Sequence, residues 1–219
     1  MRRLPFSAVI AIDGLSMRTG QLAEYFQAFY PSRDSFLGRL FFRHGERKRI
    51  KLIRSWLPSV RGLSVLDVGC GDGKLLSELM IDRARSICLE DISLSALCDA
   101  KKRLSGFSDQ LSTSVVDSFD VSSSGFDVVL AIGVVDYRSD LSAALRKLVS
   151  RTNGILIVDV PRSSHPRNWL RYLWFKLRGL DLLLVTSGRL RRALVDGGFS
   201  FDVEKGPFEW FIRIRVYRT

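Results

Sequence analysis

A chain of 219 residues is long enough for one α/β domain with a substantial core and too short for two comfortable ones. Its formal net charge of +11 predicts attraction to something anionic, such as nucleic acid, a membrane surface or an anionic small substrate, without choosing among them. Its 3 scattered cysteines and 2 histidines argue against a disulfide framework and a metal site, and no apolar run approaches the roughly 20 residues of a membrane span, so we expect a cytoplasmic protein.

The first 58 residues are predicted to form an N-terminal helical extension, or cap. Residues 1–12 contain a short apolar run but no small-residue cleavage site before Asp13, so we interpret them as an ordinary N-terminus rather than a signal peptide. Apolar residues spaced by three and four predict helices over 21–30 and 46–57, each ended by a proline. The two helices either cap the ligand edge of the domain or cover a face of its sheet.

Residues 65–74, VLDVGCGDGK, combine an apolar run, a carboxylate and alternating glycines before a helical pattern begins. This predicts a strand, a tight turn and a helix, with glycines that allow positive φ and a close approach of a ligand to the backbone. A dinucleotide site would need its third glycine one position later, where Lys74 stands. Asp67 and Asp72 would repel a pyrophosphate, but they suit a ligand that carries an ammonium and a sulfonium. The turn therefore favours S-adenosylmethionine as the cofactor.

Two more acids stand at the ends of the next two predicted strands. Asp91, with Glu90 as the alternative, follows the glycines by one helix and one strand, where an acid of a βαβ unit accepts hydrogen bonds from ribose hydroxyls. The carboxylate of Asp117 could accept the adenine amino group, and Phe119 could pack on the ring. A lone Asp at a strand end is, however, more often a turn residue.

The second half of the chain continues the alternation of strands and helices, which predicts a parallel, doubly wound α/β sheet. Further strands are predicted at 126–132, 155–160, 199–203 and 210–217. The last two are joined by a short Gly-Pro connection, which forces an antiparallel hairpin. We expect a mostly parallel, seven-stranded, Rossmann-like sheet closed by this hairpin.

The glycine motif, the acids at 90–91 and 117, and the Phe-Asp-Val-Val strand at 126–129 make the chain similar to a class I S-adenosylmethionine-dependent methyltransferase over roughly residues 48–219. We place the methyltransferase domain at residues 59–219. The resemblance implies a set of cofactor contacts. The methionine part would be held at Asp67, Gly69, Cys70, Gly71 and Gly73, the ribose at Asp91 or Glu90, and the adenine at Asp117, Ser118 and Phe119, with Ile132 beside them. The loop at 122–125 departs from the longer acidic or proline-containing loop of many relatives.

Methyl transfer is an in-line displacement at a cationic sulfonium, so the enzyme mainly has to position the acceptor and exclude water. A hydroxyl acceptor would also need a base, and His165, in the loop after the fifth strand, is the better placed of the two histidines. The sequence slightly favours the alternative, an ordinary histidine on a solvated loop. Asp136 and Tyr137 lie by position on the acceptor side, where packing roles compete with catalytic ones.

Residues 161–186 form an unusually long, basic and aromatic connection between two sheet strands, which we describe as a lid-like insertion. Aromatic and basic residues within 167–180 predict a basic amphipathic helix. Three interpretations remain open: a lid over a hydrophobic acceptor, a peripheral contact with a membrane surface, and a nucleic-acid face. Nucleic acid is the least favoured, because the sequence contains charge but no recognition module.

We therefore expect methyl transfer from S-adenosylmethionine to a small hydrophobic or anionic acceptor, such as a lipid, quinone, glycan or secondary metabolite. The alternatives are an RNA methyltransferase and a non-catalytic protein that binds S-adenosylmethionine.

Overall fold

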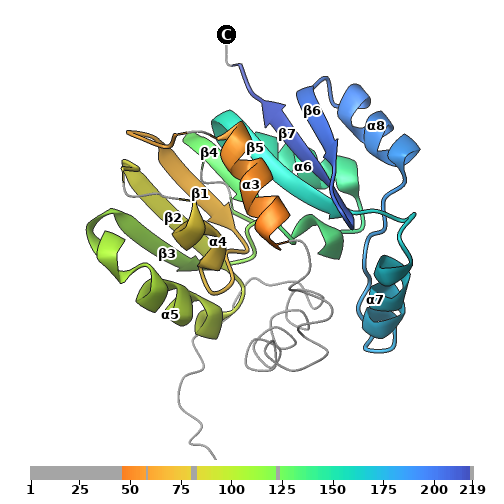
Figure 1. Cartoon of the computed structure of the whole chain (residues 1–219), viewed down its shortest axis with the longest axis horizontal. Helices are drawn as coiled ribbons and strands as arrows, with labels where there is room; N and C mark the ends of the chain where they lie inside the picture. The colour runs from red at the N-terminus through yellow and green to blue at the C-terminus, as the bar shows by residue number, and fades with distance from the viewer. Residues whose placement is uncertain (1–45, 58, 80–82, 122–123, 218–219) are drawn as a thin grey trace, which may run out of the picture.

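Seven strands pair into one mixed sheet in the order β3-β2-β1-β4-β5-β7-β6 (Figure 1). The computed structural model describes residues 46–57, 59–79, 83–121 and 124–217. The strands are β1 (Ser64–Val68), β2 (Ser86–Asp91), β3 (Leu111–Val115), β4 (Phe126–Ala131), β5 (Thr152–Pro161), β6 (Ser200–Lys205) and β7 (Glu209–Arg215). Strands β1 to β5 pair in parallel, and β7 pairs antiparallel with both β5 and β6. The predicted doubly wound sheet and its closing hairpin are confirmed.

Helices cover both faces of this sheet, which is the middle layer of a sandwich (Figure 1). The helices are α3 (Glu46–Trp56), α4 (Lys74–Glu78), α5 (Leu94–Arg103), α6 (Leu141–Val149), α7 (Pro166–Lys176) and α8 (Ser187–Asp196), with 3-10 turns η2 (Ser105–Gln110) and η3 (Val135–Tyr137). Apolar residues of α3, α4 and α5 share one core cluster with the sheet, and those of α6 and α8 share the other. Strand β1 is buried along its whole length, because helices exclude water from both sides of it.

The strand order reverses between β1 and β4, which are neighbours in the sheet but not in the chain. At such a switch point the loops after the two strands leave in opposite directions and open a crevice at the carboxyl ends, where open α/β sheets hold their ligands. The predicted cofactor residues follow β1, β2, β3 and β4, so they converge on this edge.

Helix α3 is the described part of the predicted N-terminal cap. Its side chains Ile53 and Trp56 are buried in the core cluster of the sheet face that α3 covers, while Arg49 reaches the carboxyl edge and pairs with Asp159 and Glu209. The helix therefore packs on a sheet face and also contributes to the ligand edge. The helix predicted over 21–30 lies outside the described residues, and the domain boundary at 58 stays a prediction.

The lid-like insertion contains α7, which confirms the helix predicted there, and α7 projects from the sheet beyond the carboxyl end of β5 (Figure 1). Residues 177–185 then return along the body, where the Leu183 amide donates to the backbone oxygen of Asp136 at 2.7 Å. None of the described helices is both long enough and apolar enough to cross a bilayer.

Candidate functional site

The turn after β1 is held against the end of β2 by backbone hydrogen bonds. The amides of Gly69 and Cys70 both donate to the backbone oxygen of Glu90, at 2.7 and 3.1 Å. Gly69 has a φ of 65°, and a Cβ at this position would lie 2.3 Å from a methyl group of Val134. Glycine is therefore required here twice, by the left-handed backbone and by the contact with the loop after β4.

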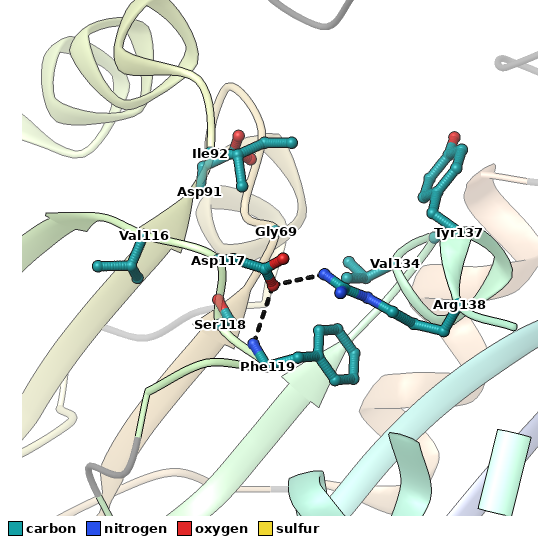
Figure 2. Close-up of a pocket in the computed structure, with 11 residues that line it drawn as sticks. Gly69, Asp91, Ile92, Val116, Asp117, Ser118, Phe119, Val134, Tyr137 and Arg138 are labelled. Carbon is teal, nitrogen blue, oxygen red and sulfur yellow. Dashed lines mark hydrogen bonds and ion pairs between the residues drawn. The ribbon is translucent and has the colours of Figure 1, made fainter. Parts of the chain in front are cut away.

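A pocket of about 80 Å³ lies at the carboxyl ends of β1 to β4 (Figure 2). It is lined by Gly69, Asp91, Ile92, Val116, Asp117, Ser118, Phe119, Gly133, Val134, Tyr137 and Arg138. Six of these belong to the predicted site: one of the turn glycines, the proposed ribose acid, the three proposed adenine residues and Tyr137. The sequence therefore predicted residues that the fold brings to one place.

Asp91 ties three parts of this pocket together. Its Oδ2 accepts a hydrogen bond from the Gly71 amide at 2.9 Å, and its Oδ1 accepts one from the Ser93 amide at 2.8 Å. Ser93 in turn caps α5 through the Ala96 amide. The carboxylate is buried and lines the pocket, which is the geometry that a ribose-binding acid needs.

Arg138, which follows η3, was not predicted and dominates the adenine side of the pocket. Its guanidinium pairs with the buried carboxylate of Asp117 and lies 4.1 Å from the centre of the Phe119 ring (Figure 2). The same carboxylate accepts a hydrogen bond from the Phe119 amide at 3.0 Å. This wall of the pocket therefore combines a buried carboxylate with a guanidinium stacked on an aromatic ring.

Glu90, the alternative ribose residue, does not line the pocket. Both of its carboxylate oxygens accept hydrogen bonds from Arg151 at 2.7 Å, and the two side chains are 3% and 1% exposed. Arg151 also donates to the backbone oxygen of Ser118 at 3.0 Å. This buried pair connects the end of β2 with the loop after β3, so we infer a positioning role for Glu90 and leave the proposed ribose role with Asp91.

Asp67, at the end of β1, is the buried acid of the glycine motif. Its Oδ2 has no hydrogen-bond partner among the described residues. Burial, and to a smaller extent the nearby charge of Asp91, raise the pKa of Asp67 to about 8. An acid without a partner beside a glycine turn is what an ammonium-bearing ligand would satisfy, so the residues present fit S-adenosylmethionine.

The raised pKa of Asp67 has a consequence for stability. Between about pH 4, the ordinary pKa of an Asp, and pH 8 the folded protein holds a proton that the unfolded chain has lost. The contribution of Asp67 to the free energy of unfolding therefore falls as pH rises through this window, by up to about 1.4 kcal/mol per pH unit, and is constant above it. Urea denaturation of the wild type and Asp67→Asn at several pH values measures this. If the difference in free energy of unfolding between the wild type and the variant did not change between pH 6 and pH 8, the raised pKa of Asp67 would be contradicted.

Next to the pocket, Tyr137 is held by Arg171 of α7. The Arg171 guanidinium pairs with Oδ2 of Asp136 and donates to the Tyr137 hydroxyl, both at 2.7 Å. The charge and hydrogen bonds of these two partners hold the pKa of Arg171 above its usual range despite burial. Asp136 is 2% exposed and does not line the pocket, whereas Tyr137 does. Of the predicted catalytic residues, Tyr137 is therefore the one that faces the pocket.

Asp159, near the end of β5, is a buried acid that the sequence did not single out. Its Oδ1 accepts a hydrogen bond from the Gly133 amide at 2.6 Å, and Arg49 of α3 lies 3.1 Å from Oδ2. Burial raises its pKa to about 6, against the lowering effect of Arg49. Gly133 lines the pocket, so Asp159 links the pocket wall to α3.

Three other predicted residues lie away from the pocket lining. His165 is the N-cap of α7: its Nδ1 accepts a hydrogen bond from the Arg167 amide at 3.2 Å, and its ring packs against Phe208. Cys70 is buried, which raises the pKa of its thiol, and Ile132 packs in the core beside Gly133. His165 thus caps α7 and does not line the pocket, and its proposed role as a base stays a prediction.

A second hollow, of about 390 Å³, lies between α3, the end of β5 and the β6–β7 turn. It is lined by Lys48, Leu52, Arg162, Glu204, Lys205, Gly206, Pro207 and Phe211. Arg162 is 8% exposed, and its Nη1 donates to the Gly206 oxygen at 2.9 Å, while its Nε has no hydrogen-bond partner in the described part of the chain. The hollow therefore combines three cations and one carboxylate, that of Glu204, with an apolar wall.

Comparison with known proteins identifies the family. The model of the family described as "Methyltransferase domain" matches residues 36–202. No curated protein sequence matches the chain.

Solved structures show the same fold at low sequence identity. The magnesium protoporphyrin IX methyltransferase of Synechocystis, with bound S-adenosylhomocysteine, is 19% identical, with a TM-score of 0.73 over 89% of this chain and 98% of that one. An S-adenosylmethionine-dependent methyltransferase from Mesorhizobium loti is 18% identical, with a TM-score of 0.62 over 75% and 96%. The [4+2]-cyclase SpnF is 18% identical, with a TM-score of 0.70 over 92% and 97%. By its matched residues and its strand order, the chain belongs to the methyltransferase domain family and has the fold of class I S-adenosylmethionine-dependent enzymes.

Proposed function

We propose that this protein transfers a methyl group from S-adenosylmethionine to a small acceptor with an apolar body and an anionic group. The observation that carries the proposal is the second hollow, where Lys48, Arg162 and Lys205 stand beside Leu52 and Phe211. These lining residues match both halves of such an acceptor, because the cations attract the anionic group and the apolar wall packs against the apolar body. Helix α3 lines the hollow through Lys48, and its Arg49 pairs with Asp159, which accepts a hydrogen bond from the pocket-lining Gly133.

Bound S-adenosylmethionine supplies an electrophilic methyl group on a sulfonium. The protein's own residues have three tasks in this proposal. Asp67 accepts a hydrogen bond from the ammonium of the methionine part. Asp91 accepts hydrogen bonds from the ribose hydroxyls, and Asp117 accepts one from the adenine amino group. Positioning accounts for most of the rate of such a displacement, so the rigid anchoring of Asp91 by two backbone amides serves the reaction directly.

Tyr137 is the proposed contact between the protein and the reacting acceptor. Its oxygen accepts a hydrogen bond from Arg171, which fixes the hydroxyl and directs its proton away from the guanidinium. Tyr137→Phe is expected to lower kcat about 10- to 100-fold, within the range of a lost proton-transfer or orienting group, with the affinity for S-adenosylmethionine unchanged. Tyr172→Phe, a half-buried tyrosine of α7, is the matched control. Equal kcat values for the wild type and Tyr137→Phe would remove Tyr137 from the reaction.

Transfer of labelled methyl to a cell extract tests the proposed function. Extraction into organic solvent, RNA isolation and protein precipitation after the reaction separate the possible acceptors, and we expect label in the organic fraction. Label in RNA would favour the RNA methyltransferase alternative. Binding of S-adenosylmethionine without any transfer would favour a protein that binds the cofactor for another purpose. One of the structural neighbours is named a [4+2]-cyclase, so proteins with this fold are not all named methyltransferases.

A further inference from the structure

Helix α7 is fixed to the body by two buried polar side chains and by one buried aromatic ring, that of Phe175. The Asn168 amide donates to the backbone oxygens of Arg162 and Phe208 at 2.8 and 2.7 Å. Arg171, from the same side of the helix, pairs with Asp136, and Phe175 completes the contact at 1% exposure. The helix is therefore held by buried hydrogen bonds and one buried ion pair.

The opposite side of α7 presents apolar residues to solvent. Trp169, Leu170, Leu173 and Leu177 are 54%, 62%, 55% and 76% exposed. Their spacing of three and four places them on one face, which we call the outer face of α7. Four large apolar side chains that follow one another on a helix form a contiguous patch, and such patches mark sites of interaction.

The chemistry of the outer face favours a lipid phase. The only polar atom of the Trp169 side chain, Nε1, already donates to the backbone oxygen of Ser163 at 2.7 Å, so the ring can leave water without losing a hydrogen bond. The other three residues are leucines, which cannot stack on nucleic-acid bases as aromatic residues do. Four residues are also few compared with the roughly 20–30 residues a side of a stable protein interface.

The charge around the outer face indicates an anionic surface. Residues 162–192 contain eight Arg and Lys residues against one acid, Asp181. Two of the cations, Lys176 and Arg178, are exposed at the end of α7 next to Leu177. Lys176 forms an exposed ion pair with Asp181 at 3.0 Å, which anionic headgroups can compete with, and Arg178 covers the ring of Trp174 at 3.4 Å from its centre. An apolar helix face beside basic residues is the arrangement by which helices lie in the interface of anionic membranes.

We propose that the outer face of α7 docks this protein on the surface of an anionic membrane. The leucines and Trp169 enter the boundary between headgroups and acyl chains, while Lys176 and Arg178 contact the anionic headgroups. The proposal goes beyond the proposed function and does not rest on it, because docking is measured without any acceptor.

Co-sedimentation with vesicles tests the proposal on the full chain. We expect binding to vesicles of phosphatidylcholine mixed with phosphatidylglycerol, weakened by salt, and far weaker binding to phosphatidylcholine alone. The variant Leu170→Ser/Leu173→Ser/Leu177→Ser should reduce the partition coefficient about 100-fold or more, since each leucine contributes about tenfold on burial. Lys176→Gln/Arg178→Gln should reduce it about 10-fold on anionic vesicles. All five substituted positions are exposed, so the variants are expected to fold, and circular dichroism checks this.

Leu94→Ser is the matched control, because Leu94 is 44% exposed on α5, at the other end of the sheet (Figure 1). The proposal is overturned if the wild type does not bind anionic vesicles, or if Leu94→Ser reduces binding as much as the triple variant does. It is also overturned if the triple variant binds vesicles normally and instead loses binding to a single-stranded RNA, or loses a dimer seen by sedimentation velocity.

Discussion

Asp91→Ala is expected to weaken the binding of S-adenosylmethionine about 100-fold or more. The variant would lose charge-assisted hydrogen bonds to two ribose hydroxyls, each worth about 1.5–3 kcal/mol. It would also release the amides of Gly71 and Ser93, which the carboxylate holds at 2.9 and 2.8 Å, and so loosen the glycine turn. Isothermal titration calorimetry measures the affinity.

Asp99→Ala is the control for this substitution, because Asp99 is an exposed acid of the neighbouring helix α5 that pairs with Lys102. It removes the same charge without touching the pocket and should leave the affinity unchanged. Thermal melting of both variants separates a lost ligand contact from a lost fold. An Asp91→Ala protein that melts as a folded domain and binds within about threefold of the wild type would refute the assignment of the cofactor site, since each tenfold is about 1.4 kcal/mol.

Arg151→Met is expected to have the largest effect on stability, a loss of about 3–5 kcal/mol in the free energy of unfolding. The substitution leaves the buried Glu90 carboxylate without the two hydrogen bonds that satisfy it. The double variant Arg151→Met/Glu90→Gln removes that charge as well and should recover part of the loss, because breaking a buried pair costs more than replacing both partners. Urea denaturation of the four proteins completes a double-mutant cycle.

The ion pair between Arg85 and Asp127 provides the comparison on the surface. It is 3.0 Å long, close to the length of the buried pair, but its side chains are 63% and 33% exposed. Arg85→Met should therefore cost about 1 kcal/mol or less. Similar losses from Arg85→Met and Arg151→Met would mean that burial does not determine the importance of the Glu90 pair.

Local patterns in the sequence were sufficient for the fold and for the cofactor side of the site. The glycine turn, the acids at strand ends and the Gly-Pro connection are each defined by residues close together in the chain. Their place in the fold can therefore be inferred from spacing alone. Asp91 and Asp117 consequently lie where the sequence predicted them, in one pocket.

The arginines of the site could not be predicted in this way. Arg138, Arg151 and Arg171 pair with carboxylates that are 21, 61 and 35 positions away in the chain. An arginine in a sequence is normally expected to be solvated, and nothing local distinguishes one that the fold buries. The amphipathic pattern of α7 was equally ambiguous, because a pattern shows that two faces differ and not which one turns inward. Here the polar face turns inward, because its Arg171 pairs with the buried carboxylate of Asp136.

The place of β7 in the sheet determines when this domain can fold during synthesis. β7 follows every other described strand in the chain, yet it lies inside the sheet, between β5 and β6. Until residues 209–215 have left the ribosome, β5 has an unpaired edge and β6 has no partner. An open edge on a buried strand is a site for pairing with other chains. The nascent domain is therefore exposed to aggregation after β5 has emerged and before β7 has, while its sheet still lacks an interior strand.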